Sequence, residues 1–424
     1  MKPIDFSVDE LEGGARLVTA PMPDRASVSL ALMFSVGSRY ESDRLGGISH
    51  FIEHLFFKGT SRRPSAQLIA EAIEGVGGVI NASTDKEVTT YWTKVPDTHL
   101  DLAADVLFDI VSDSRLTPED IERERTVILE ELKMYQDLPQ DHVHSIFEEI
   151  MWPGHPLGRD IGGTLASVAA LSRDDLVEFV KDYYGRSKLV ISASGMVDST
   201  GMAKLITERL ALTGSASGNG HTPPPPPLTA PAVRLQRKDT EQAHICIGTR
   251  ALSYLDGDRY NLDLLNTILG EGMSSRLFLE IREKRGLAYD VHSYTSKHRD
   301  CGYFAVYTGV DPSKADEAVN AIVGELRRVI DHDVPESELE KARQFTLGRL
   351  KLGLESTNAM ASWLGQQQLL AGRIRMLDEV VNAIEAVTVD SVRHVARKVL
   401  DQPLQMAVIG PFDSDGTFRK AIGA

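Results

Sequence analysis

Cysteine is scarce in this chain, which has only Cys246 and Cys301 among its 424 residues. Two cysteines cannot build the disulfide framework that stabilises many secreted domains, so we expect both to be reduced thiols. No apolar run approaches the roughly 20 residues that a membrane-spanning helix needs. The first residues also lack the basic and then apolar pattern of a secretory leader. These absences predict a soluble cytoplasmic protein with no membrane partner.

Basic residues are in the minority as well. Lys and Arg number 46 against 61 Asp and Glu, which gives a formal net charge of -15. Proteins that bind nucleic acids neutralise phosphates with Lys and Arg, so this balance argues against nucleic acid as a partner. Hydrophobic residues make up 42% of the chain, an ordinary globular composition, and the length allows more than one domain.

A linker-like segment interrupts the chain near its middle. A Gly/Ser-rich stretch there is followed by five prolines, Pro223 to Pro227. Such a composition is typical of a linker that is flexible at first and then stiff. We therefore predict an N-terminal domain at residues 1–212, a linker at 213–232 and a C-terminal domain at 233–424.

The two halves resemble each other. The apolar run 28–34 leads to an Asp-Arg pair, and so does the run 243–248. Further on, residues 116–122 match residues 334–340, and each segment has the Pro and acidic residues that open a helix. Strand runs separated by helix pairs predict an α+β fold. We expect two homologous sandwich domains, each a mainly antiparallel sheet backed by helices.

The most informative stretch is His50-Phe51-Ile52-Glu53-His54. Two histidines four residues apart share one face of a helix, and the glutamate between them points the same way. Neutral imidazoles suit zinc, and a nearby carboxylate can take a proton from water. The order His-x-x-Glu-His is the spacing of the inverzincins. The motif therefore predicts a zinc metallopeptidase.

The repeat provides an internal control for this motif. At an offset of about 215 residues between the halves, the three motif positions fall opposite Leu265, Ile268 and Leu269. The fold does not need polar residues at these places, which favours a functional role for them in the first half.

A catalytic zinc usually has three protein ligands, so one more is required. The acidic helix at residues 122–131 is the best source, and it carries several carboxylates at turn spacing. Aligning the two halves places Lys341 opposite Glu124 and Gly348 opposite Glu131. Both carboxylates are thus absent from the second copy.

The stretch 46–60 resembles the M16 metallopeptidases, the pitrilysin and insulysin group. Over the whole chain, the sequence is similar to the short two-domain subfamily that includes the mitochondrial processing peptidase and its bacterial homologues. The resemblance implies that Glu131, and not Glu130, is the third ligand. One Zn²⁺ per chain would then be bound by His50, His54 and Glu131.

The same resemblance implies the other catalytic residues. Glu53 is expected to be the general base that activates water and later protonates the leaving amine. Glu124 is expected to support the site without binding the metal. Arg282 and Tyr289 have the spacing of an Arg/Tyr pair that reaches the substrate from the second domain, where they could stabilise the developing oxyanion. From the residues alone, Arg282 is a surface residue on a charged helix, and Tyr289 is a core or strand-edge residue.

The resemblance also implies a substrate-binding strand. Asn81, Ala82 and Ser83 would lie on an edge strand beside the zinc, where an extended peptide pairs through its backbone. From the residues alone, the segment is a Gly-Gly turn with an Asn that suits it.

The predicted function is a zinc-dependent endopeptidase that hydrolyses short or unfolded polypeptides. We expect the chain to form one half of a clamshell chamber, as a homodimer or as a heterodimer with a homologous chain. Two alternatives are a peptidase that processes one specific precursor and a non-catalytic scaffold subunit of the same fold.

Overall fold

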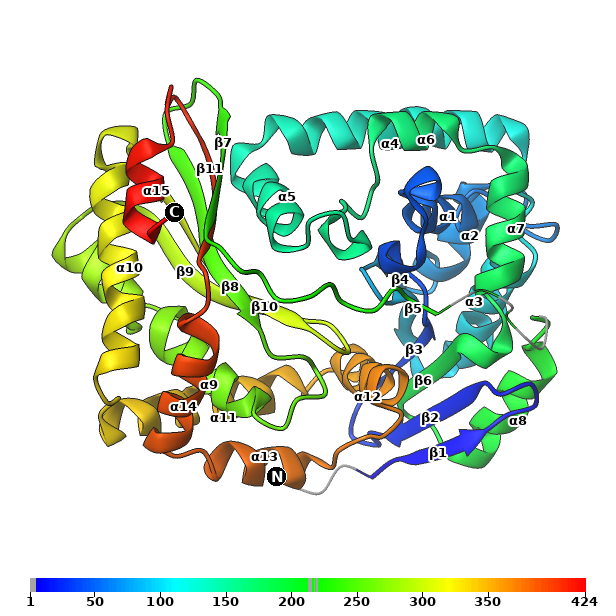
Figure 1. Ribbon diagram of the computed structural model, residues 1–424. Helices are drawn as coiled ribbons and strands as arrows, with labels where there is room; N and C mark the ends of the chain where they lie inside the picture. The colour runs from blue at the N-terminus through cyan, green and yellow to red at the C-terminus, as the bar shows by residue number, and fades with distance from the viewer. Residues whose placement is uncertain (1–4, 213–215, 217, 219) are drawn as a thin grey trace. The chain divides into compact units, whose positions relative to one another are not determined.

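The computed structural model describes residues 5–212, 216, 218 and 220–424, which form two compact units (Figure 1). The first unit contains the residues up to 133 together with 159–222 and 351–377, and the second contains 134–158, 223–350 and 378–424. Each unit therefore includes a segment from the other half of the chain. Residues 213–215, 217 and 219 of the predicted linker lie outside the described residues, and the predicted domain boundaries stay a prediction.

The first unit is built on a six-stranded sheet with the order β1-β2-β6-β3-β5-β4. Its strands are β1 (Ser7–Glu10), β2 (Arg16–Pro21), β3 (Ser27–Phe34), β4 (Val79–Thr84), β5 (Thr89–Pro96) and β6 (Leu189–Gly195). Only β2 and β6 run parallel, and all other neighbours are antiparallel. The strand β4 forms one edge of this sheet.

The helices of the first unit are α1 (Ile48–Phe56), α2 (Ala66–Glu74), α3 (Leu100–Ser112), α4 (Pro118–Asp137), α6 (Leu165–Ala170), α7 (Arg173–Tyr183), α8 (Ser199–Arg209) and α12 (Thr357–Ala371). They include α3 and α12, which pack on the sheet. Alternate residues of β3, such as Leu30 and Leu32, face the main core of the unit. The residues between them face α12, where Ser29 is hydrogen-bonded to Thr357 at 2.9 Å between the hydroxyl oxygens.

The second unit is built on a five-stranded sheet with the order β7-β11-β8-β10-β9. Its strands are β7 (Ala232–Arg237), β8 (Ala243–Ala251), β9 (Ala288–Lys297), β10 (Gly302–Val310) and β11 (Gln405–Gly410). Its helices are α5 (Pro139–Met151), α9 (Arg259–Gly270), α10 (Ala315–Asp331), α11 (Glu336–Gly353), α13 (Leu377–Glu385), α14 (Val389–Leu400) and α15 (Gly416–Ile422). Only β7 and β11 are parallel. Both sheets are thus mainly antiparallel and backed by helices, which confirms the predicted fold class.

Shorter helical turns connect these elements. Turns of 3₁₀ helix lie at Ser38–Tyr40, Asp43–Leu45, Asp97–His99, Pro156–Gly158, Arg186–Lys188 and Pro312–Lys314, and a π-helical turn lies at Phe278–Lys284. Among the helices of the described ranges, none is both long enough and apolar enough for a bilayer crossing.

The internal repeat is visible in the order of the elements. Helix α9 follows β8 as α1 follows β3, and it carries Leu265, Ile268 and Leu269. All three leucine and isoleucine side chains are buried. The second copy of this helix therefore packs on apolar residues where the first copy carries the motif.

Candidate metal centre

Gly47 and Glu41 fix the start of helix α1. Its N-cap, Gly47, has a φ of 90°, and a Cβ at this position would lie 2.3 Å from the carbonyl oxygen of Gly162. Only glycine fits such a conformation and such a close approach. The buried Glu41 carboxylate accepts hydrogen bonds from the backbone N–H groups of Gly47 and Ser49 at 2.8 and 2.9 Å. These N–H groups would otherwise have no partner at the start of the helix.

The two faces of α1 differ in character. The helix buries a set of apolar and small side chains in the core of the first unit, namely Ile48, Ser49, Phe51, Ile52, Leu55 and Phe56. The remaining face carries His50, Glu53 and His54, which are half-buried. The apolar face thus fixes the rotation of the helix and points the three motif residues in one direction.

The two histidines meet Glu131, which α4 contributes. The Nε2 atoms of His50 and His54 are 3.2 Å apart. The Oε2 atom of Glu131 is 3.8 Å from the first of them and 3.6 Å from the second. One ligand atom from each residue lies within 4.8 Å of the other two. Three side chains from two helices therefore point at a single position.

This donor set fits zinc. Two imidazole nitrogens and one carboxylate oxygen are a ligand set that catalytic zinc sites use. Burial, together with the neighbouring His54, lowers the pKa of His50 to about 4. His50 is therefore neutral at pH 7, as an imidazole that binds a metal must be. On α4, the residue before Glu131 is Glu130, which is exposed and paired with Lys133 at 2.6 Å.

The other nitrogen of His54 contacts a buried carboxylate. His54 Nδ1 is 3.1 Å from Glu124 Oε2, and Lys58 Nζ is 2.8 Å from Glu124 Oε1. Burial alone would raise the pKa of Glu124, but the hydrogen bonds from His54 and Lys58 outweigh it and lower the pKa. An ionised carboxylate that accepts a hydrogen bond from Nδ1–H leaves the lone pair of Nε2 available for a metal.

Glu53 is held from β4. The hydroxyl of Thr84, the last residue of that strand, donates a hydrogen bond to Glu53 Oε2 at 2.5 Å. Burial raises the pKa of Glu53, and the hydrogen bond from Thr84 opposes this shift. A carboxyl group with a raised pKa accepts and returns protons more readily near neutral pH. Sequence reasoning missed Thr84, whose only signal was its place next to the Asn-Ala-Ser segment.

Asn81, Ala82 and Ser83 lie in β4. On one side, β4 pairs with β5, with Asn81 opposite Trp92 and Ser83 opposite Thr90. The other side is the edge of the sheet, and α1 packs beside the strand. The segment is therefore a strand and not a turn, and its role in binding substrate stays a prediction.

Arg282 and Tyr289 lie in the second unit. Arg282 belongs to the π-helical turn, and its Nη1 atom donates a hydrogen bond to the carbonyl oxygen of Tyr289 at 2.9 Å. Its guanidinium also lies over the Tyr289 ring, 4.7 Å from the centroid. The Tyr289 side chain is 76% exposed. The two residues contact each other, and their contribution to the metal centre of the first unit stays a prediction.

Two imidazoles and a carboxylate, with a further glutamate on the same helix face, are a donor set of the kind that zinc metallopeptidases use. Comparison with known proteins agrees with this class. Residues 16–165 match the family described as Insulinase (Peptidase family M16), and residues 170–345 match the Peptidase M16 inactive domain. The chain belongs to the M16 peptidase family.

Relatives of similar length are named as zinc proteases. An uncharacterized zinc protease of Streptomyces coelicolor is 40% identical, over 95% of this chain and 88% of the relative. The uncharacterized zinc protease YmxG of Bacillus subtilis is 36% identical, over 94% of this chain and 97% of the relative.

Solved structures show the same fold. A protease from Helicobacter pylori superposes with a TM-score of 0.90 at 23% identity, covering 96% of this chain and 100% of that chain. A peptidase M16 inactive domain from Pseudomonas fluorescens also gives a TM-score of 0.90, at 17% identity, with 97% and 99% of the two chains covered.

Proposed function

We propose that this chain is a zinc-dependent endopeptidase in which His50, His54 and Glu131 hold one Zn²⁺ per chain. The observation that carries the proposal is the convergence of these three ligand atoms within 4.8 Å of one another. Glu53, on the same face of α1, is then next to the metal without being a ligand. The curated relatives, which are named zinc proteases, support the choice of metal.

Bound zinc supplies a Lewis acid that polarises the scissile carbonyl and acidifies water. Glu53 takes a proton from the attacking water and later delivers it to the leaving amine. Because Thr84 engages Oε2, we assign the proton transfer to Oε1. Glu124 accepts a hydrogen bond from His54 Nδ1 and keeps that imidazole in the orientation that ligation needs.

The proposed substrate is an extended peptide. It would add a strand to the edge of β4, beside Asn81, Ala82 and Ser83, and pair through its backbone. Backbone pairing depends on the extended conformation of the peptide more than on its sequence. We therefore expect cleavage of short or unfolded polypeptides rather than of folded proteins. Arg282 and Tyr289 are proposed to donate hydrogen bonds to the developing oxyanion from the second domain.

The proposed assembly is a homodimer in which each chain forms one half of a closed chamber, and a heterodimer with a homologous chain is the alternative. Cys246 and Cys301 are not joined in a disulfide bond, as is usual in reducing compartments, and we propose the cytoplasm as the location.

The test is hydrolysis of a flexible, internally quenched peptide by the purified chain. Activity should disappear after dialysis against a chelator and return with one equivalent of zinc. A chain that binds zinc but cleaves no unfolded peptide would contradict the proposal. A scaffold subunit would give neither zinc nor activity, and a processing peptidase would cut one precursor at one bond, which mass mapping of the products distinguishes.

A further inference from the structure

We infer that Lys58 is a positioning residue of the metal centre, which acts through Glu124 to hold His54 in its ligating state. The inference rests on the proposed function only in so far as His50, His54 and Glu131 bind a metal. It does not depend on which substrate is cleaved.

The three residues form a continuous chain of contacts. Lys58 Nζ lies 2.8 Å from Glu124 Oε1, and the second oxygen, Oε2, lies 3.1 Å from His54 Nδ1. The two carboxylate oxygens are thus divided between one cation and one imidazole. When His54 Nδ1 carries the proton and donates a hydrogen bond to Glu124, the lone pair of Nε2 is available to the metal.

Glu124 needs a cation because it is buried. Only 3% of its side chain is exposed, whereas 28% of the Lys58 side chain is exposed. A buried carboxylate that loses its cationic partner is strongly destabilised, and its side chain would turn away towards water. This movement removes the acceptor from His54 Nδ1. The ammonium group of Lys58 prevents this while its stem stays partly in water.

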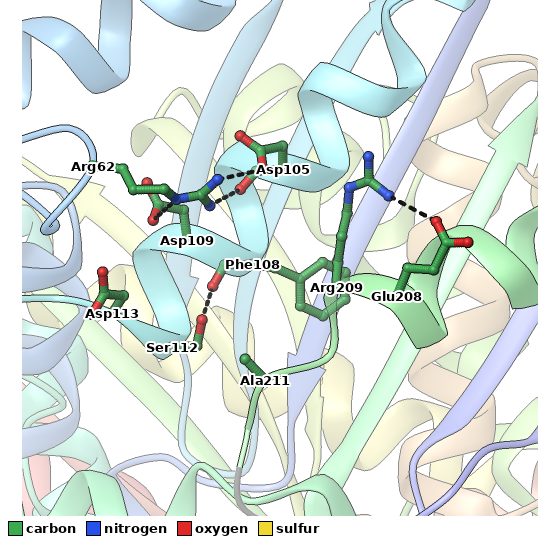
Figure 2. A pocket seen from close by; sticks show the side chains of 9 residues that line it. All are labelled: Arg62, Asp105, Phe108, Asp109, Ser112, Asp113, Glu208, Arg209 and Ala211. Carbon is green, nitrogen blue, oxygen red and sulfur yellow. Dashed lines mark hydrogen bonds and ion pairs between the residues drawn. The ribbon is translucent and has the colours of Figure 1, made fainter.

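The backbone holds Lys58 at the end of α1. Its N–H donates to the carbonyl oxygen of Leu55 at 3.0 Å, one turn back. Thr60, two residues later, donates from its hydroxyl to the buried Asp109 of α3 at 2.8 Å. Figure 2 shows Arg62 of the same loop bridging Asp105 and Asp109. The loop is therefore anchored on both sides of Lys58.

The second copy of the repeat lacks the pair. At the offset of about 215 residues, Lys58 falls opposite Met273. Aligning the two later helices at Pro118 and Pro335 places Lys341 opposite Glu124. Met273 is 76% exposed. The second copy folds without a Lys–Glu contact at these positions. The contact occurs only in the copy that carries the two histidines.

Zinc affinity tests the inference without reference to activity. The dissociation constant is measured by competition with a chromophoric chelator for the wild-type chain, Lys58→Met and Lys58→Arg. Replacing a residue that orients a metal ligand through hydrogen bonds typically weakens metal binding by roughly 10- to 100-fold. We expect a loss of this size for Lys58→Met. Lys58→Arg should stay within a few-fold of the wild type because it keeps the charge.

Lys133→Met is the matched control. Lys133 is also paired with a glutamate of α4, at 2.6 Å from Glu130 Oε1, but that pair is exposed and contacts no ligand. Its zinc affinity should equal that of the wild type. The thermal unfolding of each metal-free variant is measured alongside, and if Lys58→Met does not fold, Lys58→Gln replaces it in the same comparison.

A double-mutant cycle tests whether Lys58 affects zinc binding through Glu124. Because Lys58 acts through Glu124, Lys58→Met should change the zinc affinity by less than about twofold in a Glu124→Gln background. Wild-type affinity in Lys58→Met, or an equal loss in both backgrounds, would overturn the inference. A wild-type chain that binds zinc but cleaves no peptide would refute the proposed function and leave this result intact.

Discussion

Thr84 and Glu53 come from different elements of the first unit, and the Thr84 hydroxyl donates to Glu53 Oε2 at 2.5 Å. Thr84 ends the edge strand β4, and Glu53 lies in the middle of α1. The strand proposed to bind the substrate thereby also orients the proposed base. In the proposed mechanism, this one hydroxyl group would link peptide binding to proton transfer.

Replacing Thr84 should therefore affect turnover more than binding. We expect Thr84→Val to lower kcat by about 10- to 100-fold, because misplacing a catalytic group by 1 Å can cost that much. KM and zinc content should be unchanged, and Thr84→Ser should restore most of the rate. Thr90→Val, on the neighbouring strand and the other face of the sheet, serves as the control. Equal kcat values for Thr84→Val and wild type would refute this role.

Two adjacent glutamates should behave differently towards zinc. Glu131 points at the two histidines, whereas Glu130 is exposed and paired with Lys133. Glu131→Gln should weaken zinc binding by more than about 100-fold, which is the largest loss typical of replacing a residue that only orients a ligand. Glu130→Gln should bind zinc as the wild type does. Equilibrium dialysis with metal analysis measures both, and similar affinities for the two variants would refute the assignment.

The sequence predicted much of this centre, but not the contacts that hold it. The motif in α1 and the apolar residues of α9 followed from helical spacing and the repeat. The choice of Glu131 over Glu130 came from resemblance to a family, because both residues belong to one acidic helix. Nothing local in the sequence indicates that Thr84 would meet Glu53. Such contacts depend on how elements distant in sequence pack together.

The exchange of segments between units could not be foreseen for the same reason. The sequence of α12 indicates a helix, but its periodicity does not identify the sheet on which the helix packs. That choice shows only in three dimensions, where Thr357 is hydrogen-bonded to Ser29 of β3, far away in the chain. Gly365 contributes as well, because a Cβ there would lie 2.6 Å from Met33 Sδ.

The stability of α1 should depend on Glu41. Its buried carboxylate accepts two backbone hydrogen bonds at the start of the helix, and Glu41→Ala leaves both N–H groups without that acceptor. We expect the free energy of unfolding of the metal-free chain to fall by about 1–3 kcal/mol. Urea denaturation measures it. Asp43→Ala, which removes an exposed partner of Arg159, should change it by less than about 1 kcal/mol. Equal effects of the two substitutions would contradict this account.

The two thiols should differ in reactivity. Cys246 is fully buried, and burial raises the pKa of its thiol far above the ordinary value, whereas Cys301 is half-buried. Because the thiolate is the reactive species, iodoacetamide should modify Cys301 well before Cys246 in the native protein. Peptide mass mapping over time measures the order. Modification of Cys246 first would show that its surroundings are open to solvent.

The rate of peptide hydrolysis by zinc-loaded Glu53→Gln, compared with the zinc-loaded wild type, tests the central claim most directly. Glutamine keeps the size of the side chain and its contact with Thr84, but it cannot take a proton from water. The account predicts one zinc per chain in both proteins and a rate at least about 100-fold lower in the variant. Wild-type rates in Glu53→Gln at full zinc occupancy would contradict it.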